Sequence, residues 1–274
     1  MKHNVMQSEL YRIWKNKRVL YTALFFLMIS IIDLYLGWSD SFLNPIHRGD
    51  NAINFDWVSH PAFASFLSGR SEGHIGQMLI AWLLPIYLLF VIGDSYIKEK
   101  KLGYSSFRQC RVSRKRMLKA DLIVSFLIPF IIILIFLAIN FLLAFIVFHG
   151  GTNFNDLQTY IGTNGLSAID TLQLLHPYTT YFIYMIMFAV VAGLYSMVCK
   201  SITWIVPQYA FVYPFSYFVW MLFVITPYNL GPFVQPFTGE LDIKRAVITA
   251  ILYLSICSIV IGYGYIKRTR YDEL

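Results

Sequence analysis

The stretch from Phe126 to Phe148 reads FLIPFIIILIFLAINFLLAFIVF and is almost continuously apolar, interrupted mainly by Pro129 and Asn140. A helix needs roughly 20 apolar residues to cross the hydrocarbon core of a bilayer, and this stretch supplies them. Lipid offers no partner to an unpaired backbone N–H or C=O group, which restricts spanning segments to helices and closed barrels. The alternating pattern of a membrane barrel is absent. The stretch therefore predicts a transmembrane helix.

Five further apolar stretches have a similar length. Hydrophobic residues make up 57% of the chain and charged residues only 14%, whereas a soluble domain carries about a quarter charged residues. We predict an all-α polytopic membrane protein that forms a single domain over residues 1–274. The six expected spans are about 19–38, 75–93, 121–148, 177–199, 203–225 and 246–266.

The basic residues predict the orientation of these spans. Eighteen of the 22 Lys and Arg residues lie before the first span, between the second and third spans, at Lys200 in the expected fourth-to-fifth connection, or in the C-terminal tail. Basic residues are retained on the cytoplasmic side of membrane proteins. We therefore expect both termini in the cytoplasm, and we read the net charge of +7 as a topology signal rather than as a nucleic-acid surface.

The N-terminal segment predicts a short amphipathic helix before the first span. Apolar and polar side chains fall on opposite faces: Met6, Leu10, Ile13 and Trp14 on one, and Glu9, Arg12, Lys15 and Asn16 on the other. Such a helix is suited to lie in the cytoplasmic headgroup plane. The alternative is a basic flank that only fixes the topology.

The loop from Asp94 to Lys119 predicts a helical element that projects into the cytoplasm. Gly103 interrupts one helical stretch, and a second can begin after Val112 with Ser113 as its N-cap. Such an element can dock into a groove on a cytoplasmic partner. The alternative is a solvated positive loop that touches anionic lipid.

This loop and the layout of the chain resemble a permease subunit of the type-2 ABC exporter family. That family shows an acidic residue, a Glu, a Gly, a Pro-Val-Ser-Arg-like stretch and a Lys before the third span. The matching residues here are Asp94, Glu99, Gly103, Val112-Ser113-Arg114 and Lys119. Arg111 stands where the family often has Pro, and Tyr104 where it often has Thr. The layout matches over nearly the whole chain, and the motif is confined to this loop.

The resemblance implies a permease dimer, formed with a second copy or a paralogue, in which each half docks a separate cytoplasmic ATPase. By this resemblance the coupling element includes Asp94, Glu99, Gly103, Tyr104, Phe107 and Arg114. The chain has no Gly-x-x-x-x-Gly-Lys-Ser/Thr phosphate-binding sequence. We therefore expect no enzymatic activity and no cofactor in this chain, with ATP and Mg²⁺ bound by the partner subunit.

Polar and aromatic residues in the spans suggest a transport pathway. The candidates are Tyr209, Tyr213, Ser216, Tyr217 and Trp220 of the fifth span and Asn140 of the third. An aromatic face with hydroxyl groups would suit an amphipathic substrate, although such stripes more often serve packing. Asn140 is also a candidate for an interhelical hydrogen bond. The segment from Pro227 to Phe237 is either a re-entrant cap over a pathway or an ordered outer loop.

Together these features predict a permease subunit in a bacterial cell membrane that exports a hydrophobic or amphipathic peptide, drug or lipid. The histidine spacings match no metal-ligand motif, and no sequence motif of an intramembrane protease is present, so we expect neither a metal site nor a catalytic site. A non-transporting membrane scaffold or immunity subunit remains the alternative.

Overall fold

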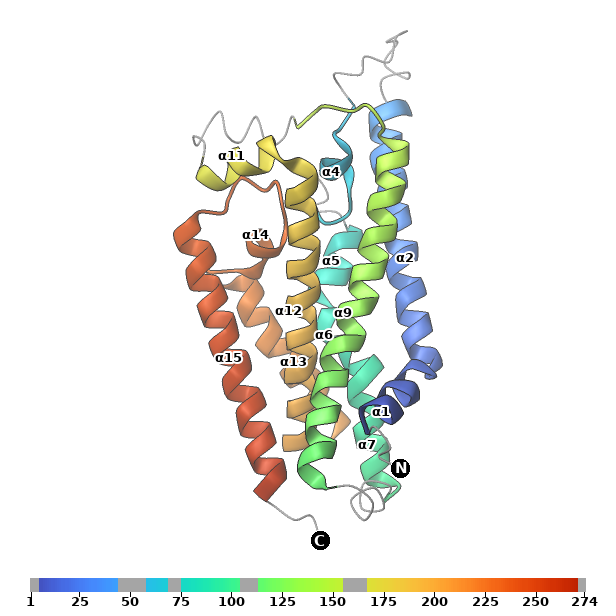
Figure 1. Cartoon of the computed structure of the whole chain (residues 1–274), viewed down its shortest axis with the longest axis vertical. Helices are drawn as coiled ribbons and strands as arrows, with labels where there is room; N and C mark the ends of the chain where they lie inside the picture. Colours follow the sequence, from blue (N-terminus) through green and yellow to red (C-terminus); the bar gives the residue numbers. More distant parts are fainter. Residues whose placement is uncertain (1–4, 44–57, 69–74, 104–112, 155–166, 271–274) are drawn as a thin grey trace.

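The computed structural model describes residues 5–43, 58–68, 75–103, 113–154 and 167–270. Within these ranges the chain is helical, and its only strand-like feature is an isolated bridge between Ser59 and Asn153. The long helices run side by side along the length of the molecule (Figure 1). The N-terminal helix and the C-terminal end of the last helix lie at one end, which we call the basic end.

The helices follow one another with few interruptions. Their bounds are α1 Val5–Trp14, α2 Lys17–Trp38, α4 Pro61–Ala64, α5 Ile75–Trp82, α6 Leu84–Leu88, α7 Asp94–Lys101, α9 Arg114–Val147, α11 Ala168–Leu175, α12 Pro177–Ile205, α13 Tyr209–Ile225, α14 Leu230–Val234 and α15 Ile243–Arg270. Two π-helical turns, Ser39–Leu43 and Leu89–Gly93, extend α2 and α6.

Four of the expected spans are confirmed as helices long and apolar enough to cross a membrane. They are α2 with its π-helical extension, α9, α12 and α15. The second expected span consists of α5 and α6 with its π-helical turn, joined at a bend of 56°. The fifth, α13, is a shorter apolar helix.

Two expected span boundaries are wrong: the fourth span ends later than position 199, and the fifth, α13, begins at Tyr209 rather than at 203. α12 continues through Lys200 to Ile205, so Lys200 lies inside a helix and is buried instead of standing in a connection. A lone basic residue was read as the end of a span, but its side chain is accommodated within the bundle. α9 begins at Arg114 with Ser113 at the N-cap position, as predicted for the second helix of the loop, and it continues without a break into the third span.

α1 is a helix as expected, but the division of its faces is partly wrong. Glu9, expected on the polar face, is buried together with Ile13. Met6 and Trp14 are exposed, as an interfacial helix with its apolar face toward lipid predicts. The cause of the Glu9 burial is Arg12, which forms ion pairs with Glu9 and with Glu99 of α7. This charge compensation lets a carboxylate lie against the bundle.

Asn140 joins α2, α9 and the segment after α4 in the interior. Its Oδ1 accepts a hydrogen bond from the Phe66 backbone N–H at 2.9 Å, and its Nδ2 donates to the Ser30 carbonyl oxygen at 3.1 Å. The side chain is 1% exposed. The predicted interhelical hydrogen bond is therefore confirmed through Nδ2, and Oδ1 binds the segment after α4.

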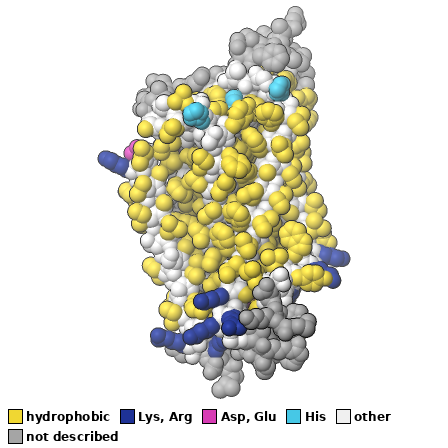
Figure 2. Space-filling view, viewed as in Figure 1, with side chains coloured by type: hydrophobic (Ala, Val, Ile, Leu, Met, Phe, Trp, Pro, Cys, Tyr) yellow, Lys and Arg dark blue, Asp and Glu magenta, His cyan; other side chains and the backbone are white. Residues whose placement is uncertain are grey.

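The side chains exposed on the bundle separate by type along its length. An apolar belt covers the middle, most Lys and Arg side chains gather at the basic end, and histidines lie near the opposite end (Figure 2). A broad apolar belt of this kind matches a lipid environment better than water, since monomeric soluble proteins rarely expose large continuous apolar surfaces.

Candidate functional site

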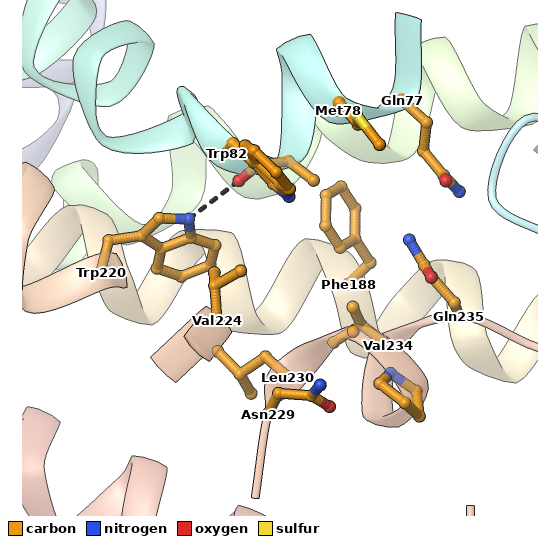
Figure 3. A pocket seen from close by; sticks show the side chains of 13 residues that line it. Gln77, Met78, Trp82, Phe188, Trp220, Val224, Asn229, Leu230, Val234 and Gln235 are labelled. Carbon is orange, nitrogen blue, oxygen red and sulfur yellow. Dashed lines mark hydrogen bonds between the residues drawn. The ribbon is translucent and has the colours of Figure 1, made fainter. Parts of the chain in front are cut away.

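A pocket of about 260 Å³ lies where the broken helix α5–α6 meets α12, α13 and α14 (Figure 3). Its apolar side is formed by aromatic and aliphatic side chains, and its polar side by three amides. The described lining residues are Gln77, Met78, Ala81, Trp82, Phe188, Trp220, Val224, Asn229, Leu230, Gly231, Pro232, Val234 and Gln235.

The broken helix follows from Pro85. Proline has no N–H group, so the carbonyl oxygen four residues earlier, that of Ala81, loses its usual helical donor. The indole N–H of Trp220 supplies a replacement, donating to the Ala81 oxygen at 2.8 Å (Figure 3). Trp220, which the sequence placed on a possible pathway, thus lines the pocket and also holds α13 against the break.

Gln77 on α5 presents a hydrogen-bond acceptor to the pocket. Its Nε2 donates to the carbonyl oxygens of Phe66 and Ser68, at 3.2 and 3.4 Å. These carbonyl oxygens can only accept, so the amide nitrogen must face them. The Oε1 atom of Gln77 is then turned toward Gln235, which faces it across the pocket (Figure 3).

The segment that carries Gln235 enters the bundle instead of running over its end. Leu230, Val234 and Phe237 are all buried. This burial shows that the segment from Pro227 to Phe237 is ordered and packed on the other helices, which both the re-entrant cap and the ordered outer loop predict. The Phe237 N–H donates to Oε1 of Gln173 at 2.8 Å, which fixes the position of the segment's end.

Most of the other expected pathway residues lie away from this pocket. Tyr209 lies near α7, with the Lys101 ammonium group 5.2 Å from its ring centre. Ser216 is buried, and its carbonyl oxygen accepts a hydrogen bond from Tyr195 at 2.5 Å. Tyr213 and Tyr217 are half-buried and are not among the lining residues. Asn140 does not line the pocket. It is linked to it through the backbone of Phe66, whose N–H donates to Asn140 and whose carbonyl oxygen accepts from Gln77.

The remaining polar lining residues were missed because only the folded chain brings them together. Gln77 lies in an apolar stretch, where an isolated amide is a usable sequence signal. Gln235 and Asn229 lie in the Pro- and Gly-rich segment that the sequence analysis singled out, but nothing local indicated which residues they would face.

At the basic end, α7 is joined to three other helices. Glu99 forms an ion pair with Arg12 of α1. Tyr96 is buried between two cations: its ring centre lies 5.5 Å from the ammonium nitrogen of Lys200 on α12 and 5.3 Å from the guanidinium carbon of Arg268 on α15. Such contacts between a cation and an aromatic face stabilise buried positive charge.

The expected coupling residues lie around this helix. Asp94 is the first residue of α7, and Gly103 follows its end with a φ of 70°, which confirms that this glycine ends the helix. Arg114 is the first residue of α9. Tyr104 and Phe107 lie outside the described residues. Glu99 thus lies on α7 at the basic end, and Gly103 lies just beyond the end of this helix.

His60 is a titratable group at the end opposite the basic end. Burial lowers its pKa from 6.5 to about 4. Its ring stacks on Phe154 and contacts Tyr178, with ring centres 4.9 and 4.8 Å apart, and its Nδ1 accepts a hydrogen bond from the Ala62 N–H at 3.2 Å. An accepting Nδ1 carries no proton, so the neutral form fits this environment.

Over the residues that the structure describes, the fold and its apolar surface define a helical membrane protein, with four helices long and apolar enough to cross a bilayer. The chain is 30% identical over 271 residues to a Bacillus subtilis (strain 168) protein described as "Uncharacterized protein YybM", and the match spans 98% of this chain and 100% of the relative. The chain belongs to the YybM family. No protein-family model and no solved structure matches it.

Proposed function

We propose that this protein is the permease subunit of an ATP-driven exporter that resembles the type-2 ABC family. It would cross a bacterial cell membrane six times, with the second span broken at Pro85 and α13 as the fifth. The basic end would face the cytoplasm, since Lys and Arg gather there (Figure 2). The substrate would be a hydrophobic or amphipathic peptide, drug or lipid.

The observation that carries this proposal is the set of contacts made by α7. This helix continues from the broken second span and ends at Lys101, two residues before Gly103, at the basic end. Glu99 connects it to α1, and Tyr96 connects it to α12 and α15. A partner that displaced the loop after α7 would therefore move several helices together, which is what coupling to a motor requires.

The partner would be a separate cytoplasmic ATPase dimer, because this chain lacks the phosphate-binding sequence that ATP hydrolysis needs. A second permease copy or a paralogue would complete the membrane part. The second and fifth spans would then line the pathway, and the pocket between α5 and α13 lies on it.

The experiment compares Gly103→Ala with Gly150→Ala in the complex with the partner ATPase. Both glycines have positive φ, 70° and 81°, and an added Cβ at either position meets nothing within 4 Å. The two variants therefore carry the same backbone strain, at opposite ends of the bundle. We expect Gly103→Ala to reduce substrate-stimulated ATP hydrolysis and transport, and Gly150→Ala to leave both close to wild type.

Three results would reject the proposal. If no ATPase co-purifies with the chain, or if Gly103→Ala and Gly150→Ala behave alike in transport, the coupling role of α7 is wrong. If an ATPase associates but no substrate stimulates it, the passive scaffold or immunity subunit is the better explanation.

A further inference from the structure

The pocket between α5, α12, α13 and α14 has a neutral surface. Among its described lining residues, none has an ionisable side chain. A charged ligand would lose its hydration there without meeting an opposite charge, which is strongly unfavourable. Charge alone therefore divides possible ligands into two classes and favours the uncharged one.

The polar groups of the pocket can satisfy a ligand that both donates and accepts hydrogen bonds. Gln77 offers the acceptor Oε1, since its Nε2 is committed to Phe66 and Ser68. Gln235 is only 9% exposed, and within the described part of the chain its side-chain amide makes no hydrogen bond. Its amide points into the pocket toward Gln77 (Figure 3). Neither of its amide atoms is among the fully buried polar atoms that lack a partner, so both are accessible from the pocket, where a ligand can complete their hydrogen bonds.

The segment that presents Gln235 is held in a fixed position. Phe237 has a φ of 62°, which is unfavourable for a bulky residue. The surroundings impose it: Gln173 accepts the Phe237 N–H, and the Phe237 ring packs against Phe63 and Phe154, at centre distances of 6.1 and 5.6 Å. A strained backbone that its neighbours hold in place is common at ligand sites.

The volume limits the size of the ligand group. A pocket of about 260 Å³ corresponds to the liquid volume of roughly nine water molecules. That is room for one ring, one small headgroup or one short alkyl chain, but not for a peptide, and the three amides of the lining favour a polar group over an alkyl chain. Met78 and Trp82 are exposed at the outer surface of α5, so an attached apolar tail can continue past them along the outside of the bundle.

We propose that this pocket binds the uncharged, hydrogen-bonding headgroup of an amphipathic molecule. Gln77 would accept a hydrogen bond from it, Gln235 would donate one, and Trp82, Phe188 and Trp220 would contact its apolar side. That this ligand is the exported substrate rests on the proposed function. The binding itself does not, because every group involved belongs to this chain.

The test measures binding of radiolabelled octyl glucoside to the chain in phosphatidylcholine nanodiscs, with empty nanodiscs as background. Competitors that share the octyl tail are octyl sulfate and octyltrimethylammonium, and free glucose tests whether the tail is required. We expect saturable binding of octyl glucoside that the two charged amphipaths and free glucose displace only weakly. Equal competition by the charged amphipaths or by free glucose, or no binding above background, would overturn the proposal.

Three variants complete the test. Gln235→Leu should weaken octyl glucoside binding by roughly tenfold, as expected for losing a buried hydrogen-bonding group. Gln208→Leu, the same change at an exposed position at the basic end, should leave binding intact. Gln235→Glu should shift the preference toward octyltrimethylammonium, a gain that misfolding cannot imitate. Wild-type affinity in Gln235→Leu would also overturn the proposal.

The result is separable from the outcome of the ATPase experiment. Binding without any associated ATPase would keep this site and reject the transport function. If an ATPase associates and responds to Gly103→Ala but octyl glucoside does not bind, the transport function stands and the headgroup site is rejected.

Discussion

The Trp220 indole N–H donates to the Ala81 carbonyl oxygen at 2.8 Å, and this is the carbonyl that Pro85 leaves without a helical donor. One hydrogen bond therefore connects three features: the break in the second span, the position of α13 and one wall of the pocket. In a low-dielectric interior, an unpaired carbonyl group is costly enough for a side chain on another helix to compensate for it.

A double-mutant cycle measures this compensation. Trp220→Phe removes the donor and should lower the free energy of unfolding by about 1–2 kcal/mol, partly through lost packing. In a Pro85→Ala background, residue 85 regains an N–H that can reach Ala81, so the hydrogen-bond part of that loss should disappear. Unfolding in mixed micelles, followed by circular dichroism, gives both differences. An identical loss in both backgrounds would show that only packing is involved.

Alanine substitutions at two glycines of α15 distinguish the stability cost of a steric clash between helices from the stability gained by higher helix propensity. A Cβ at Gly264 would lie 2.8 Å from the Ser201 Cβ and 3.1 Å from the Ser201 carbonyl oxygen, whereas at Gly262 it would meet nothing within 4 Å. Gly264→Ala must therefore push α15 away from α12, at a cost of about 1–3 kcal/mol. Gly262→Ala should be neutral or stabilising, by up to about 1 kcal/mol, because alanine favours the helix.

Thermal unfolding of the two alanine variants tests this difference, with the wild type as reference. The expected order of midpoints is Gly262→Ala at or above wild type, then Gly264→Ala below both. A Gly264→Ala protein as stable as Gly262→Ala would mean that α12 and α15 are not in close contact at Ser201.

Arg12 should contribute more to stability than its partner Glu99. Arg12 neutralises two carboxylates, that of Glu99 and that of Glu9, whose side chain is only 4% exposed. Arg12→Gln removes this shared counter-charge, for which we expect a loss of about 2 kcal/mol. Glu99→Gln leaves the pair of Arg12 with Glu9 intact and should cost less than about 1 kcal/mol. Thermal unfolding at low ionic strength measures both, and equal losses would contradict the bridging role of Arg12.

The sequence predicted those features that depend on local chemistry. The apolar length of α9 and α12 defines them as candidate spans, Gly103 ends α7 because its φ of 70° suits glycine, and Ser113 occupies the N-cap position of α9. Asn140 was predicted to form an interhelical hydrogen bond because an amide in a continuous apolar run needs a partner. Each of these follows from one residue and its immediate neighbours.

The features that were wrong or missed depend on contacts between distant segments. Glu9 is buried because Arg12 also reaches α7, and Lys200 can lie inside α12 because the Tyr96 ring is adjacent. The pocket requires Gln77 of α5 and Gln235, which directly follows α14, to face each other. Periodicity within one helix contains no information on which helix will lie opposite, so these partners emerge only from the folded chain.

Acid should destabilise the end of the protein where His60 lies. Burial among Phe154 and Tyr178 lowers the pKa of His60 to about 4, so the unfolded chain, with a pKa of 6.5, binds the proton more readily than the folded one. The stability contributed by neutral His60 is complete above pH 6.5 and is lost as the pH falls toward 4. Protonation of Nδ1 would also remove the acceptor for the Ala62 N–H at the start of α4.

His60→Asn keeps an N-cap acceptor that does not titrate, so its unfolding midpoint should decline less than that of the wild type across this window. His149→Asn, at an exposed histidine, tests whether any histidine replacement has this effect. Parallel pH profiles for the wild type and His60→Asn would show that His60 does not control the response.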